Sequence, residues 1–275
     1  MQWADKKDNI RALILTGSLA SGGNTDFLSD IDIAVYCSDF SFLYNDDWLN
    51  EIDDYILCID DKFDFFGYII PTRLTIFNKD FKADFSFHPL EILEKLSSGI
   101  ELPDSYNIGC EILLDKDRSL TKMRSPEFEG FKIKLPVSEE FKNNNDEFWF
   151  EIYNAAKYLY RNDLWAARFR DNTAKEKLLQ MLEWNHGLKS KGNLSPKNFG
   201  KDMNIWLDEN LWSDLDLCFG KLNKQDSLSA MKNLIKLYRK TAIQTAELLG
   251  YEYGQKVDEN ISIIINELDI NSSAK

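Results

Sequence analysis

The first half of the chain carries its apolar residues in short runs, several of which alternate with polar residues at every second position. This period is typical of β-strands, whose successive side chains point to opposite faces of a sheet. The strands are predicted over residues 12–16, 31–36, 73–77 and 82–87. Residues 78–80 are predicted to join the last two strands as a hairpin, and Pro89 to begin a short helix over residues 90–96.

The second half repeats its apolar residues every three to four positions, which is the period of an amphipathic helix. The predicted helices cover residues 146–161, 173–188 and 226–249. Gly250 follows the last of these, in the position where a glycine commonly ends a helix. The small polar tail, residues 271–275, is expected to fray.

The change of period falls in a polar stretch between Leu120 and Asn145 that contains Pro126, Gly130 and Pro136. Such residues mark linkers between domains. We therefore predict an α+β fold of two domains. Residues 1–135 would form a mixed β-sheet flanked by helices, and residues 136–275 an all-α helical domain.

The charge of the chain narrows the choice of partners. There are 46 acidic against 33 basic side chains, a formal net charge of −13. A field of this sign repels nucleic acid and anionic membranes and attracts cations, although an acidic surface can also serve solubility alone. We expect no nucleic-acid or membrane partner, and a monomer or weak homodimer.

Cysteine spacing and the polar N-terminus indicate the compartment. The four cysteines are too widely spaced for a zinc site or a disulfide framework, and no apolar run reaches membrane-spanning length. The first eleven residues are too polar for a signal peptide. A cytoplasmic protein with reduced thiols is the prediction.

The segment from residue 15 to residue 36 carries the candidate chemistry. A predicted strand ends at Gly17 and Ser18, and the next begins at Asp30 and Asp32. Side chains two residues apart in a strand share a face, so the two carboxylates would lie side by side and repel each other unless a cation joins them. A divalent metal with oxygen ligands, above all Mg²⁺, is the expected partner.

A third acid, Asp84, has apolar or small neighbours and interrupts the otherwise β-prone run of a later predicted strand. If that strand pairs with the strand of Asp30 and Asp32, three carboxylates can hold two metals ~3.5–4 Å apart, the spacing that clamps an in-line phosphoryl displacement. Gly17 would let the backbone approach a phosphate, and Ser18 would offer it a hydroxyl and an N–H. Serine-hydrolase and P-loop motifs do not occur in the chain.

Several blocks of the sequence extend this pattern. They are FLSDIDI (27–33), NDDWLN (45–50), KADFSFHPLE (82–91), LLDKD (113–117), EFW (147–149) and LLQMLEW (178–184). In this order they resemble the aminoglycoside 6-adenylyltransferases, the streptomycin adenylyltransferase family of the polymerase-β-like nucleotidyltransferase superfamily. The resemblance spans nearly the whole chain.

The resemblance implies an antibiotic-resistance enzyme that moves AMP from ATP to a hydroxyl of an aminoglycoside such as streptomycin and releases pyrophosphate. It implies an N-terminal nucleotidyltransferase domain and a helical substrate-binding domain. Asp30, Asp32 and Asp84 would then be catalytic and hold Mg²⁺, with Asp84 as the candidate general base. Gly17, Ser18 and Ser29 would bind the ATP triphosphate.

One departure from the family concerns Leu19, because an arginine usually stands at this position of the family. Arginine binds phosphate through two parallel hydrogen bonds, which leucine cannot make. We expect Lys175, Lys177 or Arg168 of the helical half to supply the charge, and assign Lys175 to the nucleotide site.

A cationic, hydroxyl-rich substrate needs carboxylates and an aromatic face. Glu147, Trp149 and Glu151 open the first predicted helix of the second domain and are the candidate substrate residues. Two alternatives remain open at this stage. One is a nucleotidyltransferase of the same fold that modifies another small molecule or a protein, and the other is a binding protein that has lost catalysis.

Overall fold

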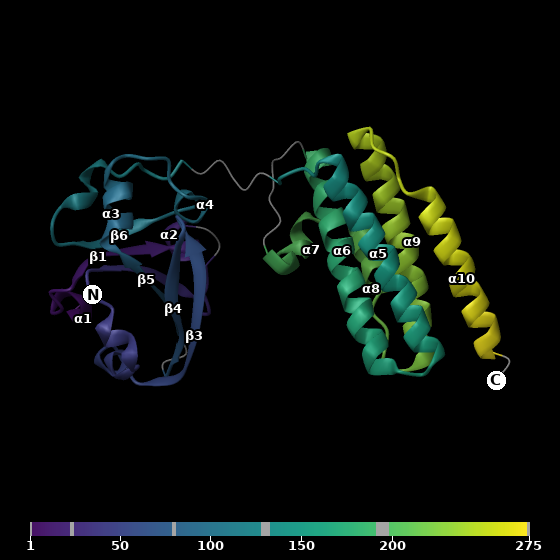
Figure 1. Ribbon diagram of the computed structural model, residues 1–275, viewed down its shortest axis with the longest axis horizontal. Helices are drawn as coiled ribbons and strands as arrows, with labels where there is room; N and C mark the ends of the chain where they lie inside the picture. The colour runs from purple at the N-terminus through teal and green to yellow at the C-terminus, as the bar shows by residue number, and fades with distance from the viewer. Residues whose placement is uncertain (1, 23–24, 79–80, 128–132, 191–197, 274–275) are drawn as a thin grey trace. The chain divides into compact units, whose positions relative to one another are not determined.

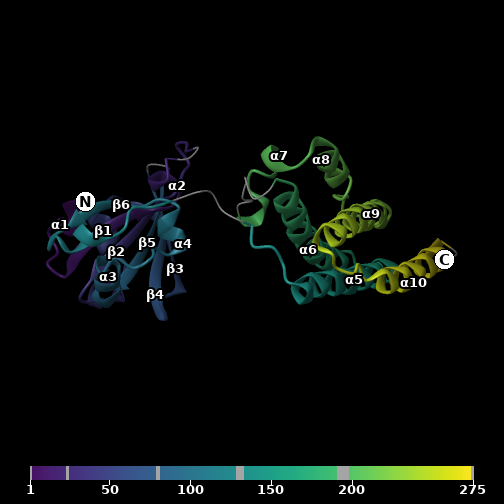
Figure 2. The ribbon, with the colours of Figure 1, turned by 90° about the horizontal axis from the view of Figure 1, so that it is seen from above.

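The computed structural model describes residues 2–22, 25–78, 81–127, 133–190 and 198–273 (Figures 1 and 2). The chain divides into two compact units, Met1–Glu129 and Gly130–Lys275, called here the N-terminal unit and the helical unit. The first contains a mixed sheet with flanking helices and the second is helical, which confirms the predicted α+β fold class. The predicted boundary after residue 135, and the function assigned to each domain, stay predictions.

The N-terminal unit is built on a six-stranded sheet. Its strands are β1 (Ile10–Thr16), β2 (Ile31–Cys37), β3 (Tyr55–Phe65), β4 (Tyr68–Phe77), β5 (Lys82–Pro89) and β6 (Glu111–Asp115). They lie in the order β3-β4-β5-β2-β1-β6, in which β2 and β5 are parallel and the other neighbours antiparallel. Four of the strands contain the four predicted runs, while β3 and β6 were not predicted.

Alternating side chains give each face of this sheet a core of its own. On one face, Leu13, Val35 and Phe85 pack against residues of α1 (Gln2–Asp5) and of the 3₁₀ turn η2 (Asp47–Glu51). On the other face, Ile14 and Tyr36 pack against α3 (Leu90–Ser97) and α4 (Asp104–Asn107). Even-numbered residues of β2 point to the second face, so Asp32 lies on the α3 side of the sheet.

The remaining elements of this unit are short. They are α2 (Gly17–Ala20), η1 (Ser41–Tyr44) and η3 (Ser119–Lys122). The predicted helix over residues 90–96 is α3, which begins directly after Pro89. Of the predicted hairpin connection over residues 78–80, residues 79 and 80 lie outside the described residues.

The described residues of the helical unit include four long helices, which share one core. The elements of this unit are α5 (Ser138–Tyr160), α6 (Leu164–Ser190), η4 (Asn198–Gly200), α7 (Met203–Trp206), α8 (Glu209–Asp216), α9 (Lys224–Leu249) and α10 (Gln255–Ser273). The long helices are α5, α6, α9 and α10, and residues of the first three form most of the core, where the ring of Tyr238 stacks on Phe148 with centroids 3.5 Å apart. The Tyr238 hydroxyl donates to Asn145 Oδ1 at 2.9 Å, which satisfies a polar group inside the core.

The helix boundaries in the structure differ from the predicted ones in two respects, the starts of α5 and α6 and the C-terminal tail. The helices α5 and α6 begin eight and nine residues before the predicted starts at 146 and 173. The first turn of α5 is polar and gives no apolar period, whereas α6 opens with the apolar residues Leu164–Ala167. The tail predicted to fray is helical as far as Ser273, and residues 274–275 lie outside the described residues. Gly250 caps α9 with a left-handed φ of 69°, as predicted. None of the described helices has both the length and the apolar character needed to cross a lipid bilayer.

Candidate active site

Three strand ends of the N-terminal unit meet at one end of the sheet. The parallel strands β2 and β5 both begin there, and Asp32 lies opposite Asp84 in the register. The antiparallel strand β1 ends there, with Thr16 opposite Asp32 and Gly17 next in the chain. Asp30, Asp32 and Asp84 are called here the carboxylate cluster. The backbone pairing therefore brings together residues that lie far apart in the sequence.

The electrostatics of the carboxylate cluster favour a bound cation. Burial, with the nearby charges of Asp84 and Asp30, raises the pKa of Asp32 to about 6. Asp84 Oδ1 is buried and has no hydrogen-bond partner. Neighbouring carboxylates, one of which keeps a buried oxygen without a donor, fit a divalent ion with oxygen ligands, so the residues present suit the metal that the sequence predicts.

Lys82 is the residue of this site that the sequence analysis did not assign. Its Nζ donates hydrogen bonds to Asp30 Oδ2 and to Asp84 Oδ2, each 2.8 Å long. Burial opposes the charge of Lys82, but these hydrogen bonds outweigh it and raise the pKa of the ammonium group. The two-residue spacing of Lys82 and Asp84 on one strand face was the available signal.

Gly17 is required by its position at the end of β1. Its φ is +73°, and a Cβ atom added there would lie 2.1 Å from Asp32 Oδ2. No other residue could bring the backbone this close to the carboxylate. Ser18 follows as an exposed residue of α2, and the Ser29 hydroxyl accepts a hydrogen bond from the backbone N–H of Asp26 at 2.9 Å.

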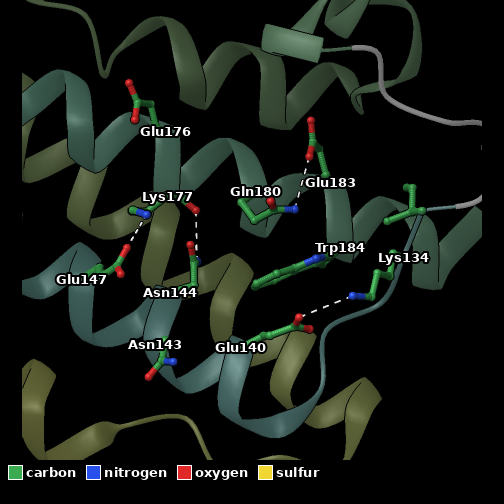
Figure 3. A pocket seen from close by; sticks show the side chains of 11 residues that line it. Lys134, Glu140, Asn143, Asn144, Glu147, Glu176, Lys177, Gln180, Glu183 and Trp184 are labelled. Carbon is green, nitrogen blue, oxygen red and sulfur yellow. Dashed lines mark hydrogen bonds and ion pairs between the residues drawn. The ribbon is translucent and has the colours of Figure 1, made fainter. Parts of the chain in front are cut away.

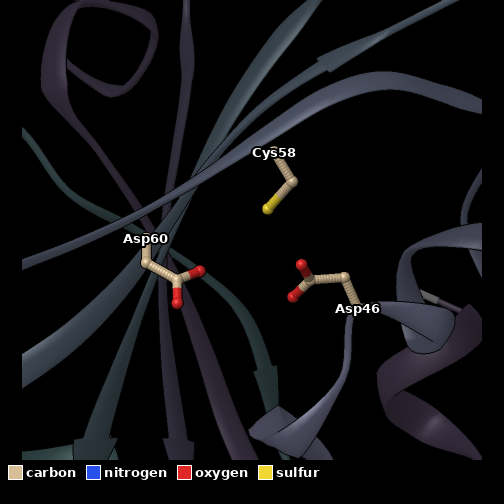
Figure 4. A group of neighbouring side chains, drawn as sticks. All are labelled: Asp46, Cys58 and Asp60. Carbon is tan, nitrogen blue, oxygen red and sulfur yellow. The ribbon is translucent and has the colours of Figure 1, made fainter.

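A second group of acidic side chains lies in this unit, and an arginine balances its negative charge. Asp46, Cys58 and Asp60 place their ligand atoms within 4.8 Å of one another (Figure 4), a spacing that the carboxylate cluster does not reach. The Arg73 guanidinium already supplies the cation, with Nε 2.9 Å from Asp46 Oδ1 and 3.1 Å from Asp60 Oδ1. Arg73 also donates to the carbonyl of Leu43 at 2.9 Å. This group therefore ties the loop before η2 to the sheet.

The helical unit contains a pocket of about 720 Å³ between α5 and α6 (Figure 3). It is called here the acidic pocket, and its lining residues are Ile133, Lys134, Glu140, Asn143, Asn144, Glu147, Glu176, Lys177, Gln180, Glu183 and Trp184. Four glutamates against two lysines leave an excess of two negative charges. Burial raises the pKa of Glu183, whose carboxylate accepts a hydrogen bond from Gln180 at 3.3 Å.

Of the three predicted substrate residues, the structure brings only Glu147 to this pocket. Glu147 pairs there with Lys177 (Figure 3). Trp149 is 1% exposed inside the helical core, so its ring offers no face to a ligand. Glu151 is 8% exposed and pairs with Arg170 at 3.0 Å, which neutralises its charge. Glu140, Glu176, Glu183 and Trp184 were not predicted, although their spacing of three, four or seven residues from polar neighbours places them on shared helix faces.

The cations expected to replace the family arginine are all engaged within the helical unit. Lys175 pairs with Asp171 and lies over the ring of Phe219 at 4.8 Å. Arg168 also contacts Asp171, at 3.1 Å, and Lys177 pairs with Glu147. The nucleotide-binding role of Lys175 stays a prediction.

Comparison with known proteins gives one family across the chain. The sequence model of the family described as Streptomycin adenylyltransferase matches residues 1–268. The Aminoglycoside 6-adenylyltransferase of Campylobacter jejuni is 25% identical over 268 residues, which cover 95% of this chain and 90% of that protein. The protein of the same name from Bacillus subtilis (strain 168) is 26% identical over 275 residues, with 95% and 92% covered.

A solved structure is similar along the same length. The crystal structure of an aminoglycoside 6-adenyltransferase from Bacillus subtilis aligns with 97% of this chain and 94% of that one, with 23% sequence identity and a TM-score of 0.48. The matches to the family model and to the curated relatives run through both the N-terminal unit and the helical unit.

Proposed function

Because the chain belongs to the streptomycin adenylyltransferase family, we propose that it transfers AMP from Mg-ATP to a hydroxyl group of a streptomycin-like aminoglycoside and releases pyrophosphate. The membership confirms the predicted family and enzyme class, an aminoglycoside 6-adenylyltransferase-like nucleotidyltransferase. The family also implies a nucleotide substrate and, typically, a divalent metal. The single observation that carries the proposal is the register of β2 and β5, which sets Asp32 opposite Asp84.

In this proposal the carboxylate cluster holds Mg²⁺. When bound, the ion neutralises charge on the phosphates and orients the displacement at the α-phosphorus. The fit rests on the burial of Asp32 beside two other acids and on the unpartnered Oδ1 atom of Asp84. Gly17 brings the backbone close to Asp32, and Ser18 and Ser29 are the proposed donors to the triphosphate.

The proton of the attacking hydroxyl needs an acceptor. Asp84 Oδ1 makes no hydrogen bond in the protein, so it can take that proton. The substrate oxygen then forms a bond to the α-phosphorus while the bond from that phosphorus to the bridging oxygen of pyrophosphate breaks. Asp84 is therefore the proposed general base.

The acidic pocket is the proposed site for the positively charged groups of the aminoglycoside. Its excess of glutamates has the sign that such a substrate requires, and Trp184 gives it an apolar floor (Figure 3). A pocket of about 720 Å³ is in the range that binds ligands of this size. Trp149 and Glu151 have no role in this proposal, because both are engaged within the helical core.

The test is a product assay with purified protein, Mg²⁺, ATP and a panel of aminoglycosides that includes streptomycin. We expect release of pyrophosphate and a gain of one AMP in the mass of the drug. Asp84→Asn should lower turnover by about 10³-fold while ATP still binds, since the positioned base and a metal ligand are lost together. The matched control is Asp61→Asn, which removes an exposed acid of β3 and should leave turnover unchanged.

The outcome that contradicts the proposal is equally specific. No pyrophosphate release with any aminoglycoside, from protein that binds Mg-ATP, would exclude this acceptor class. Modification of a different small molecule in the same assay would keep the nucleotidyl transfer and change the acceptor.

A further inference from the structure

Lys82 occupies the space between two members of the carboxylate cluster. Its Nζ lies 2.8 Å from Asp30 Oδ2 and 2.8 Å from Asp84 Oδ2. The side chains of Asp30, Lys82 and Asp84 are 44%, 35% and 21% exposed, so the contact is partly shielded from water. The ammonium group thus satisfies two carboxylates whose charges would otherwise repel each other.

A divalent ion shared by Asp30 and Asp84 would compete with this ammonium group for the same two carboxylates. An ammonium group and a divalent cation held between Asp30 and Asp84 would repel each other at close range. Binding of the ion therefore requires that Lys82 give up both hydrogen bonds. Lysine suits such an exchange, because its ammonium is a single point charge at the end of a flexible four-carbon stem.

We propose that Lys82 is a resident counterion of the carboxylate cluster, which a divalent metal must displace from Asp30 and Asp84. Lys82 then sets the metal affinity of the free protein and is a positioning residue for the two acids. The inference rests on the metal-holding role given to the cluster under the proposed function.

The displaced ammonium remains close to the reaction. Lys82 is two residues from Asp84 on the same face of β5, so it cannot leave the neighbourhood of the metal. The position of Leu19 offers no cation to the phosphates, and Arg168, Lys175 and Lys177 are engaged within the helical unit. Lys82 is thereby placed to contact the phosphates that the metal carries.

The experiment measures binding of Mn²⁺ to the protein without nucleotide, from the electron paramagnetic resonance signal of the free ion. Lys82→Met should bind Mn²⁺ about tenfold more tightly than the wild type, because the competing charge is gone. Lys82→Arg should stay within about twofold of the wild type, because it keeps a cation between the acids.

Lys7→Met is the matched control. Lys7 belongs to the same unit and pairs with Glu51 at 2.9 Å, so its removal changes the net charge equally without touching the cluster. Its Mn²⁺ affinity should match that of the wild type. A rise in affinity for Lys7→Met as large as that for Lys82→Met would assign the effect to net charge and overturn the proposal.

Unchanged or weaker Mn²⁺ binding by Lys82→Met, in protein with a wild-type thermal midpoint, also overturns the proposal. A lysine that only held the strands together would instead lower the thermal midpoint on removal. If Lys82→Met does not fold, Lys82→Gln is measured in its place with the same two outcomes.

Variants of Asp30 and Asp84 distinguish a failure of this inference from a failure of the proposed function. If Asp30→Asn and Asp84→Asn bind Mn²⁺ as the wild type does, the cluster is no metal site and the proposed metal role fails. If these two variants lose Mn²⁺ binding but Lys82→Met matches the wild type, only the displacement by metal is wrong.

Discussion

The carboxylate cluster and the acidic pocket both gather acids, but they hold them in different ways. In the cluster, Asp32 and Asp84 are short side chains on neighbouring strands, and the backbone register sets their separation. In the pocket, Glu147 extends from a helix on a longer stem and is 57% exposed, whereas Asp84 is 21% exposed. The first arrangement is fixed before a ligand arrives, and the second can adapt to one.

The fixed carboxylates suit the positioning of a metal ion, and the more exposed ones suit the binding of a cationic substrate. In-line displacement tolerates little error in the position of a metal ligand, so aspartates on strands are appropriate. A polycation can be bound by several partly exposed carboxylates, each of which contributes little by itself. The comparison predicts that small changes at the carboxylate cluster lower turnover strongly. Changes in the acidic pocket should alter substrate binding only moderately.

After the loss expected for Asp84→Asn, the next largest effect is expected from Gly17→Ala. The added methyl group would lie 2.1 Å from Asp32 Oδ2, so the turn or the carboxylate must move. A displacement of about 1 Å at a catalytic group costs roughly 10²-fold in rate, and we expect a loss of turnover of that size. The measurement is kcat for adenylyl transfer with thermal unfolding of the same sample.

Gly67→Ala is the control for this change. Gly67 has a similar positive φ of 79°, but nothing lies within 4 Å of an added Cβ. It should lose only the ~1 kcal/mol that a left-handed conformation costs an alanine, with turnover intact. Equal loss of turnover in both variants would show that backbone strain, rather than the contact with Asp32, is what matters.

A shallower effect is expected in the acidic pocket. Glu147→Gln and Glu183→Gln should each raise the KM for an aminoglycoside by about five- to tenfold with little change in kcat, because each removes binding energy that is the same before and during the reaction. The effect should shrink as salt is added. Steady-state kinetics at two ionic strengths measure both.

Glu139→Gln removes an exposed acid from the same helix outside the pocket and should leave KM unchanged. A fall in kcat with constant KM for Glu147→Gln would instead make that residue part of the chemistry, and the distinction between the two acidic regions would fail.

The smallest effect concerns stability. The pKa of Asp32 is raised to about 6 in the folded protein, so the folded state retains a proton that the unfolded chain has already lost. Stability should therefore fall as the pH rises from about 4 to above 6, and Asp32→Asn should abolish this part of the fall. After discount for solvent and for Lys82, the variant should be about 1 kcal/mol more stable at pH 7.5 and no more stable near pH 4. Denaturant unfolding at the two pH values measures it, and a variant that is less stable at pH 7.5 would contradict the burial of an ionised Asp32.

Much of the N-terminal unit could be predicted from the sequence. The apolar runs of β1, β2, β4 and β5 are buried on one or both faces, so their pattern is strong. Strand β3 lies at an edge of the sheet, and the apolar run of its first half passes into a charged second half with Asp60, Asp61 and Asp64, so it shows neither a sustained apolar run nor a regular alternation. Edge strands with charged side chains resist unwanted pairing, which is also why they are hard to recognise.

The candidate site was predictable only where neighbours in sequence are neighbours in space. Asp30 and Asp32 follow from two-residue spacing, and Asp84 from the assumption that β5 pairs with β2. Trp149 was misplaced because α5 is covered on several sides, so a helical stripe does not identify the exposed face. The partner of Glu151 is Arg170, nineteen residues away on the next helix, and no local pattern reveals such a pair.

The parallel pairing of β2 and β5 also limits how this protein can vary. Side chains alternate along β5, so the insertion or deletion of one residue between Lys82 and Asp84 would turn the acid toward the opposite layer of the sheet. The hairpin of β3 and β4 that precedes β5 is under no such restriction at its tip, where Gly67 has open space around it. Length variation should accordingly be tolerated at that tip, whereas a one-residue change between Lys82 and Asp84 should abolish catalysis even where the sheet itself still folds.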